Sequence, residues 1–166
     1  MEEGLLYVPP MYFKPETLPI IFLGGPIQGT RDWQSNAITY IHGKAKHLNI
    51  ASPRRLTFDE SVDYDTQVDW ELYHLSKAGD KGVVLFWMAK EDFHECTRAF
   101  AQTSRWEVSE FKMRHQFKGT KIAVGIEEGF SGGRYMRKRF KQECPDIKIY
   151  NTLEDTCDEA IRLASA

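Results

Sequence analysis

A short apolar run near the start of the chain ends in glycine: Ile20-Ile21-Phe22-Leu23, then Gly24-Gly25. A continuous apolar run of this length is typical of a strand that is buried on both faces of a sheet. Residues 31–47 then carry apolar side chains at helical spacing, namely Trp33, Ala37, Ile38, Ile41 and Ala45. The two segments together predict a strand, a tight turn and a helix.

The same alternation continues to the end of the chain. Further strands are predicted near 49–52, 83–87, 121–125 and 147–150, and further helices near 65–78, 104–117, 133–143 and 153–164. Strands that alternate with helices of this length form a parallel sheet that is covered on both faces. We therefore predict one α/β domain with a doubly wound, five-stranded parallel sheet of the flavodoxin-like type, in the strand order 2-1-3-4-5.

The first 19 residues differ in composition from the rest. Four prolines, Pro9, Pro10, Pro15 and Pro19, exclude a helix or an interior strand in this segment. We predict a proline-rich N-terminal arm over residues 1–19, extended and packed against an α/β domain that comprises residues 20–166.

The charge pattern argues against duplex nucleic acid as a partner. The formal net charge is −2 and the basic residues are dispersed, whereas duplex-binding proteins present a broad basic surface. One basic run exists, and we interpret it as a solvated helix face rather than a phosphate or nucleic-acid patch: Arg134, Arg137, Lys138, Arg139 and Lys141.

The sequence also lacks the signals of membrane or secreted proteins. No apolar stretch approaches the roughly 20 residues that span a bilayer, and the acidic start is unlike a secretory signal. Cys96, Cys144 and Cys157 have irregular spacings without a CxxC pair, which favours reduced thiols. We expect a cytoplasmic protein with no membrane partner, no metal site and no cofactor.

The functional groups should gather at the carboxyl edge of the sheet. Ligands of such folds bind there, near the switch point between the first and third strands. Three segments are placed at this edge: residues 24–30, 67–71 and 103–107. The connection over residues 89–102 is longer than usual in a compact domain, so we predict that it is functional.

Two of these segments have a purely structural alternative. Asp69 lies three residues after Thr66, and Glu107 lies three residues after Ser104, which is the spacing of a helix-capping box. Glycines serve tight strand-to-helix turns as readily as they serve ligand contacts. Convergence of all these segments at one edge is what favours a functional interpretation.

Two carboxylates beside a pocket suit glycosidic chemistry. One attacks the anomeric carbon of a sugar, while another acid protonates or orients the leaving group. Four tryptophans lie beside these segments; most are predicted to belong to the core, and one or two to stack on a nucleobase: Trp33, Trp70, Trp87 and Trp106.

A succession of motifs then points to a known family. They are Ile21–Ile27, Asp32-Trp33-Gln34, Pro53-Arg54-Arg55, Gln67-Val68-Asp69-Trp70-Glu71, Val84–Trp87 and Glu107-Val108-Ser109. Their order and spacing from about residue 20 to 164 resemble the nucleoside 2-deoxyribosyltransferase-like family. Members of the wider superfamily cleave the N-glycosidic bond of 2'-deoxynucleosides or nucleotides and pass the sugar to another base or to water.

The resemblance implies roles for particular residues. Glu107 would be the nucleophile, and Asp69 the carboxylate that contacts the sugar or assists the leaving base, with Glu71 as the alternative to Asp69. Arg54 would hold an anion or brace its loop. The predicted substrate-binding residues are Gly24, Gly25, Gln28, Trp33, Arg54, Glu71, Trp87 and Ser104.

We therefore expect an enzyme, a nucleoside deoxyribosyltransferase or nucleotide N-glycosidase, that acts on a small nucleoside or nucleotide. A homodimer or higher homo-oligomer is implied by the resemblance. The alternative is a catalytically weak nucleotide-binding or sensing module that uses the same pocket. Two departures from the family pattern suggest that alternative: Phe22 replaces a tyrosine, and Ser109 replaces a glycine. Flavin binding, a third possibility, rests on fold analogy alone.

Overall fold

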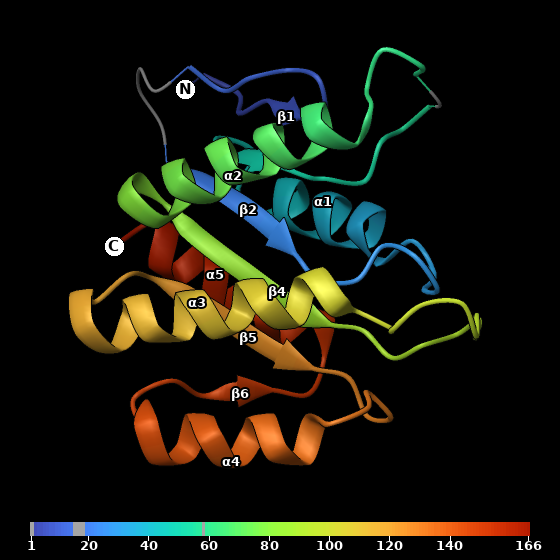
Figure 1. Cartoon of the computed structure of the whole chain (residues 1–166). Helices are drawn as coiled ribbons and strands as arrows, with labels where there is room; N and C mark the ends of the chain where they lie inside the picture. The colour runs from blue at the N-terminus through green and yellow to red at the C-terminus, as the bar shows by residue number, and fades with distance from the viewer. Residues whose placement is uncertain (1, 15–18, 58) are drawn as a thin grey trace.

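The computed structural model describes residues 2–14, 19–57 and 59–166. Within these ranges an α/β fold is formed by strands and helices that alternate along the chain (Figure 1). The elements are β1 (Leu6–Tyr7), β2 (Ile20–Gly24), α1 (Trp33–Lys44), β3 (Asn49–Ala51), α2 (Tyr64–Lys81), β4 (Val83–Met88), α3 (Gln102–Lys118), β5 (Ile122–Ile126), α4 (Gly133–Glu143), β6 (Ile149–Tyr150) and α5 (Leu153–Ala164).

The strands form one parallel sheet of six strands in the order β1-β3-β2-β4-β5-β6. The prediction of five strands in the order 2-1-3-4-5 is therefore wrong for the sheet as a whole. The difference is β1, which the predicted N-terminal arm contributes and which pairs with β3 at the edge. Because β1 precedes the prolines, its backbone remains available for pairing: Ser52 N donates to Tyr7 O at 2.9 Å.

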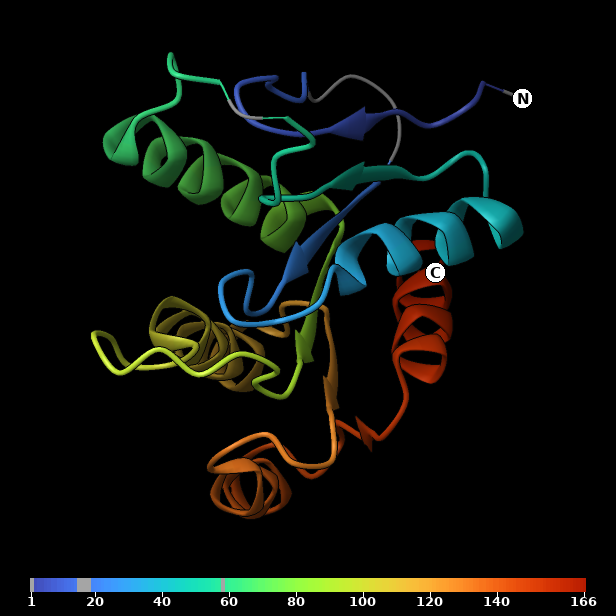
Figure 2. The same cartoon turned by 90° about the vertical axis from the view of Figure 1, so that its right-hand side faces the viewer.

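Helices cover both faces of the sheet. Figure 2 shows the sheet nearly edge-on, with α2, α3 and α4 on one side and α1 and α5 on the other. Side chains of each central strand alternate between the two layers: Phe22 and Phe86 pack toward the first group of helices, and Leu23 and Leu85 toward the second. This alternation explains why β2 and β4 are continuous apolar runs, because both faces of each strand are buried.

The helix starts differ from the capping pattern expected from the sequence. Helix α2 begins at Tyr64, and its cap is Asp63 rather than Thr66. The Asp63 carboxylate accepts from Thr66 N at 2.8 Å. Helix α3 follows Ala101, a residue with φ of 57° that caps nothing with its side chain. The predicted capping boxes of Thr66 with Asp69 and of Ser104 with Glu107 are therefore wrong. Neither carboxylate is occupied in capping its helix.

The N-terminal segment is docked on α2. Trp70 Nε1 donates to Met11 O, Tyr73 Oη donates to Phe13 O at 2.7 Å, and Phe13 N donates to His74 Nε2 at 3.0 Å. His74 is fully buried, and its ring lies 4.1 Å from that of Trp70. Since Nε2 accepts, Nδ1 carries the proton and donates to Trp70 O at 2.7 Å. The segment therefore holds His74 as the neutral tautomer.

The boundary between the predicted arm and the domain falls next to residues outside the described ranges. The junction of the predicted arm and domain includes residues 15–18, which lie outside the described residues, so the division at residues 19 and 20 stays a prediction. Within the described residues, no helix combines the length and apolar character that crossing a membrane requires.

We predict that His74 makes stability depend on pH. Burial lowers the pKa of His74 below its usual 6.5, so the unfolded chain binds its proton more readily than the folded protein. Stability is therefore full above about pH 6.5 and falls as the pH drops below that value. Thermal unfolding between pH 5 and 8 should show this fall in the wild type and a smaller one in His74→Gln, which should cost roughly 1–3 kcal/mol at pH 7.

The matched control is His94→Gln, because the His94 side chain is exposed. This variant should keep the wild-type pH dependence. An acid-side loss of stability as large in His74→Gln as in the wild type would contradict the assignment of a neutral, buried His74.

Candidate active site

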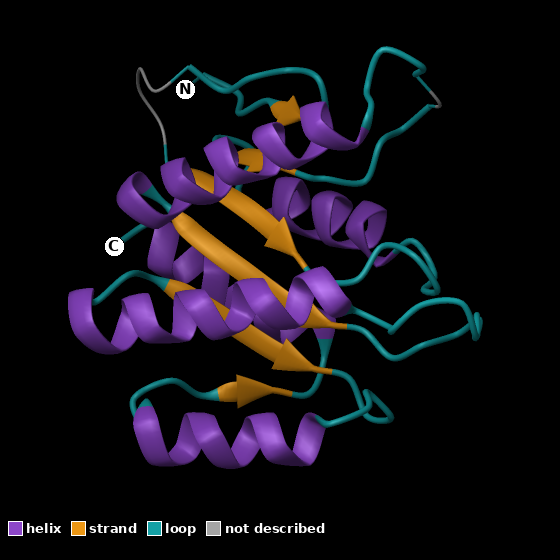
Figure 3. Ribbon diagram, in the orientation of Figure 1, coloured by secondary structure: helices purple, strands orange, loops and turns teal. Residues whose placement is uncertain are grey.

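A cavity of about 970 Å³ opens at the carboxyl edge of the sheet, between α2 and α3. Four segments line it: the turn after β2, the loop after β3, the first half of α2, and the end of the long loop together with the first turns of α3. These segments sit where the crossover connections leave the strands, as the loops in Figure 3 show. A second cavity, about 760 Å³, lies beside Gly79–Gly82 and Lys118–Lys121 and holds none of the predicted site residues.

Four carboxylates line the main cavity: Asp63, which caps α2, Glu71 of α2, and Glu107 and Glu110 of α3. Burial, followed by repulsion from Glu71 and Glu110, raises the pKa of Glu107 to about 8. Within the described residues, the Glu107 carboxylate has no hydrogen-bond or ion-pair partner. Glu110 differs because it pairs with Arg114 at 2.9 Å. The surroundings of Glu107 in the cavity therefore favour its protonated form.

Glu71 is partly buried as well, but its carboxylate accepts a hydrogen bond. Burial raises its pKa, and the hydrogen bond from Gln67 Nε2, at 3.0 Å to Glu71 Oε1, opposes that rise. The same Gln67 nitrogen donates to Pro53 O at 3.0 Å. Two neighbouring carboxylates are therefore held in unlike surroundings, which is how enzymes give paired acids different roles.

The cavity brings together seven of the ten predicted site residues. Those that line it are Gly24, Gly25, Gln28, Arg54, Glu71, Ser104 and Glu107. Ser104 is 6 % exposed and lies one helical turn before Glu107. The strand-to-helix turns of the family resemblance and the paired carboxylates therefore meet in one place.

Asp69 is not among the lining residues. It lies on the exposed side of α2, since residues two positions apart on a helix point in different directions. Of the two carboxylates that the sequence left open for this role, Glu71 lines the cavity and Asp69 does not. A sequence signal for Glu71 existed: it falls on the helical stripe of Val68, Leu72 and Leu75, which line the cavity.

Trp33 and Trp87 belong to the core rather than to the cavity lining. They are 2 % and 5 % exposed, and neither reaches the cavity. Both instead shape the turn after β2. A side chain on Gly25, which has φ of 148°, would come within 2.2 Å of Trp87 O and 2.7 Å of the Trp33 ring. The substrate-stacking role predicted for these two tryptophans does not fit their positions.

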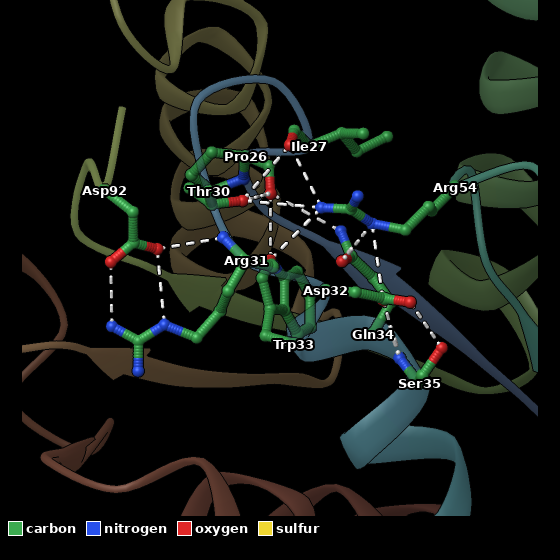
Figure 4. Close-up of polar contacts among 10 residues, drawn as sticks. All are labelled: Pro26, Ile27, Thr30, Arg31, Asp32, Trp33, Gln34, Ser35, Arg54 and Asp92. Carbon is green, nitrogen blue, oxygen red and sulfur yellow. Dashed lines mark hydrogen bonds and ion pairs between the residues drawn. The ribbon is translucent and has the colours of Figure 1, made fainter. Parts of the chain in front are cut away.

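The turn after β2 is held by a dense set of hydrogen bonds, drawn in Figure 4. Pro26 O accepts from Trp33 Nε1 at 2.8 Å and from Thr30 Oγ1 at 3.1 Å. Arg54 donates to Gln34 Oε1 at 2.8 Å and to Ile27 O at 3.0 Å, and pairs with Asp32 at 3.3 Å. Of the two roles left open for Arg54, bracing the loop is the one that these contacts describe.

The long connection after β4 is fastened to the same turn. Asp92 forms two hydrogen bonds with the Arg31 guanidinium, at 2.9 and 3.2 Å, and accepts from Arg31 N at 2.8 Å (Figure 4). Gly29 O accepts from the backbone nitrogens of Asp92 and Phe93. The segment continues into residues 98–101, which line the cavity. Three carboxylates of this connection, Glu91, Asp92 and Glu95, lie outside the lining.

The start of α3 is anchored from the opposite side. The Arg105 guanidinium donates to Phe100 O at 3.2 Å and to Ser131 Oγ at 2.7 Å, and lies 4.4 Å from the Phe130 ring. These contacts fix the helix turn that carries Ser104 and Glu107. Ser109, one helical turn after Arg105, does not line the cavity, and its hydroxyl donates to Arg105 O at 2.9 Å.

Several lining residues carry no prediction from the sequence as site residues. Gln67, Arg98 and Tyr64 are among them. Trp106, named only as one of four possible stacking aromatics, lines the cavity with 79 % of its surface exposed. Because this ring is exposed at the cavity, it can pack on a flat ligand.

The part of the chain that lines the cavity also matches a protein family. The model of the family described as nucleoside 2-deoxyribosyltransferase like matches residues 19–130. The chain belongs to this family. A comparison with curated proteins gave no match. The matched range ends at residue 130 rather than near 164, where the motif resemblance was drawn, but it contains every residue that lines the main cavity of this nucleoside 2-deoxyribosyltransferase-like protein.

The cavity lining combines apolar side chains, such as Leu72 and Phe100, with hydrogen-bonding and acid–base groups. Within the described residues, no three His, Cys, Asp or Glu side chains are placed to hold a metal ion together. The free thiols of Cys144 and Cys157 are buried away from the cavity.

Proposed function

We propose that this protein cleaves the N-glycosidic bond of a deoxynucleoside or nucleotide and transfers the sugar to another base or to water. The observation that carries the proposal is the position of Glu107, which is partly buried in the cavity wall, has no partner within the described residues and lies near a second carboxylate, Glu71. Family membership supports the same class of chemistry. A cavity of this size accommodates a molecule as large as a nucleotide.

The reaction would take two steps. The ionised Glu107 carboxylate attacks the anomeric carbon, the bond from that carbon to the base nitrogen breaks, and the base leaves with the electron pair and takes up a proton from water. A nitrogen of a second base, or a water oxygen, then attacks the same carbon. The bond from that carbon to the Glu107 oxygen breaks, and the attacking group gives up its proton to water. Glu71 would accept a hydrogen bond from the sugar and stabilise the positive charge that develops on the ring. Trp106 would pack against the base.

The rival proposal of a binding or sensing module has one observation in its favour. Phe22 lines the cavity, is 1 % exposed and provides no hydroxyl to orient the nucleophile. The second departure from the family pattern carries less weight, because Ser109 does not line the cavity. Tight binding of nucleotides without base release, measured by calorimetry and chromatography, would favour the module.

We further propose that a second copy of this chain covers the outer surface of α2 and α3. Large apolar side chains are exposed along both helices: Leu72 and Trp106, which line the cavity, and Met113 and Phe117 further along α3. Light scattering of the purified protein should give at least twice the 19.2 kDa of one chain. A monomer at all concentrations would contradict this part of the proposal.

The test of the catalytic assignment is Glu107→Gln. This variant keeps the shape of the side chain and removes the nucleophile, so base release from any nucleoside or nucleotide that the wild type uses should fall at least about a thousandfold. Its melting temperature should not fall, because a neutral amide is easier to bury than a carboxylate. Chromatography of free bases and thermal unfolding measure the two effects.

A matched pair on α2 controls that experiment. Glu71→Gln should lower the rate, and Asp69→Asn should retain it, since only the first residue lines the cavity. Full activity in Glu107→Gln, or a larger loss in Asp69→Asn than in Glu71→Gln, would overturn the assignment.

The pH profile tests the role of Glu107 as a nucleophile rather than an acid. With a pKa of about 8, the carboxylate is mostly protonated at pH 7 and becomes ionised as the pH rises. For a nucleophile, kcat/KM should therefore increase through pH 8 before it levels off. A rate that decreases above pH 8 would make Glu107 the proton donor instead.

A further inference from the structure

Gln67 ties the carboxylate of Glu71 to another part of the fold. It lies one helical turn before Glu71 on α2, and both side chains line the cavity. Its amide nitrogen spans the distance between two elements: it donates to Glu71 Oε1 within α2 and to Pro53 O in the loop after β3, both at 3.0 Å.

The orientation of this amide follows from its partners. Pro53 O is a backbone carbonyl, which only accepts hydrogen bonds, and an ionised carboxylate only accepts as well. The end of the amide that faces both must be the nitrogen, whose two hydrogens are then both used. The reverse orientation would place the amide oxygen against two acceptors. The contacts therefore require the donor end of Gln67 to face Glu71.

This arrangement leaves the other end of the amide unsatisfied. Gln67 Oε1 is buried and has no hydrogen-bond partner within residues 2–14, 19–57 and 59–166. A buried polar atom without a partner opposes folding, and proteins keep few of them. A side chain present only for packing would avoid this cost, so the amide must be held for what its nitrogen does.

We propose that Gln67 is the positioning residue of the site: its amide, anchored on Pro53, holds the Glu71 carboxylate in the cavity in its ionised, hydrogen-bond-accepting form. The inference rests on the proposed function for the purpose of that carboxylate, which is to accept a hydrogen bond from the sugar. Gln67 itself does not touch the reacting atoms.

The surroundings of Glu71 explain why such a residue is needed. Glu107 and Glu110 of α3 line the same cavity and disfavour a further negative charge. The cations of the lining are Arg54 and Arg55 from the loop after β3, and Arg98 from the long connection. Arg54 is occupied by the turn after β2, Arg55 donates to Val62 O at 3.0 Å, and Arg98 pairs with Glu95 at 3.3 Å. The direct hydrogen bond to Glu71 Oε1 comes from Gln67.

The experiment uses two substitutions with opposite consequences. Gln67→Met keeps the length and bulk of the side chain and removes the donor. Gln67→Lys keeps a donor that can face Glu71 and Pro53 and adds a positive charge. The titration of Glu71 should therefore move to higher pH in the Met variant and to lower pH in the Lys variant, each by roughly one pH unit.

The titration is measured directly on the full-length protein by carbon-detected NMR of the glutamate carboxyl groups, with Glu71→Gln to assign the signal. Gln116→Met is the matched control, because Gln116 is exposed on α3 outside the cavity lining; it should leave the Glu71 titration unchanged. Circular dichroism checks that each variant folds, and either Gln67 variant alone suffices for a directional result.

Identical Glu71 titrations in the wild type and both Gln67 variants, or shifts in the same direction, would overturn the inference. Activity provides a second measurement: kcat for base release should fall on the order of tenfold to a hundredfold in Gln67→Met, with a smaller change in KM. Opposite shifts in a protein that releases no base would retire the proposed function and leave the role of Gln67 standing. An active wild type whose Glu71 titration ignores Gln67 would do the reverse.

Discussion

The placement of two partly buried carboxylates in one cavity is the constraint around which this site is organised. Burial raises the pKa of both Glu71 and Glu107, and repulsion from Glu71 raises that of Glu107 further. The surroundings of the two carboxylates differ: within the described residues, Glu71 accepts a hydrogen bond and Glu107 accepts none. The hydrogen bond favours the ionised form of Glu71, whereas the surroundings of Glu107 favour its protonated form.

The fold supplies the geometry that this conflict requires. Glu71 and Glu107 are 36 positions apart in the chain and lie on separate helices, α2 and α3, which cover the same face of the sheet (Figures 1 and 2). Parallel crossovers bring the first halves of both helices to the carboxyl edge. The remaining walls are braced by side chains that do no chemistry: Arg54 holds the turn after β2, and Asp92 fastens the long connection to Arg31. Rigid walls keep two like charges close when each would be more stable apart.

The sequence predicts most of this fold because its strands and helices have clean periodicity. The central strands β2 and β4 are unbroken apolar runs. Strand β1 escaped prediction because two residues are too few for any period, and its pairing depends on β3. The starts of α2 and α3 were misjudged because Thr66 and Ser104 resemble caps locally, whereas Asp63 and Ala101 are selected by the tertiary structure.

The same distinction governs the site. Glu107 could be named from its motif, but choosing between Asp69 and Glu71 requires the direction in which α2 faces. Gln67 was beyond sequence reasoning, since its importance lies in a contact with Pro53, 14 positions away in the chain and on another element. Trp33 and Trp87 were assigned to the ligand because tryptophan suits both stacking and packing, and only burial separates the two uses.

The central claim is that Glu107 forms a covalent bond to the sugar. The most direct measurement is mass spectrometry of the protein after incubation with a 2'-deoxy-2'-fluoronucleoside or its monophosphate, because fluorine at that position slows breakdown of a glycosyl ester. We predict a mass increase equal to the fluorinated sugar, located by peptide mapping on Glu107 and missing from Glu107→Gln. An adduct on another residue, or release of the base with no adduct at any time, would contradict the account.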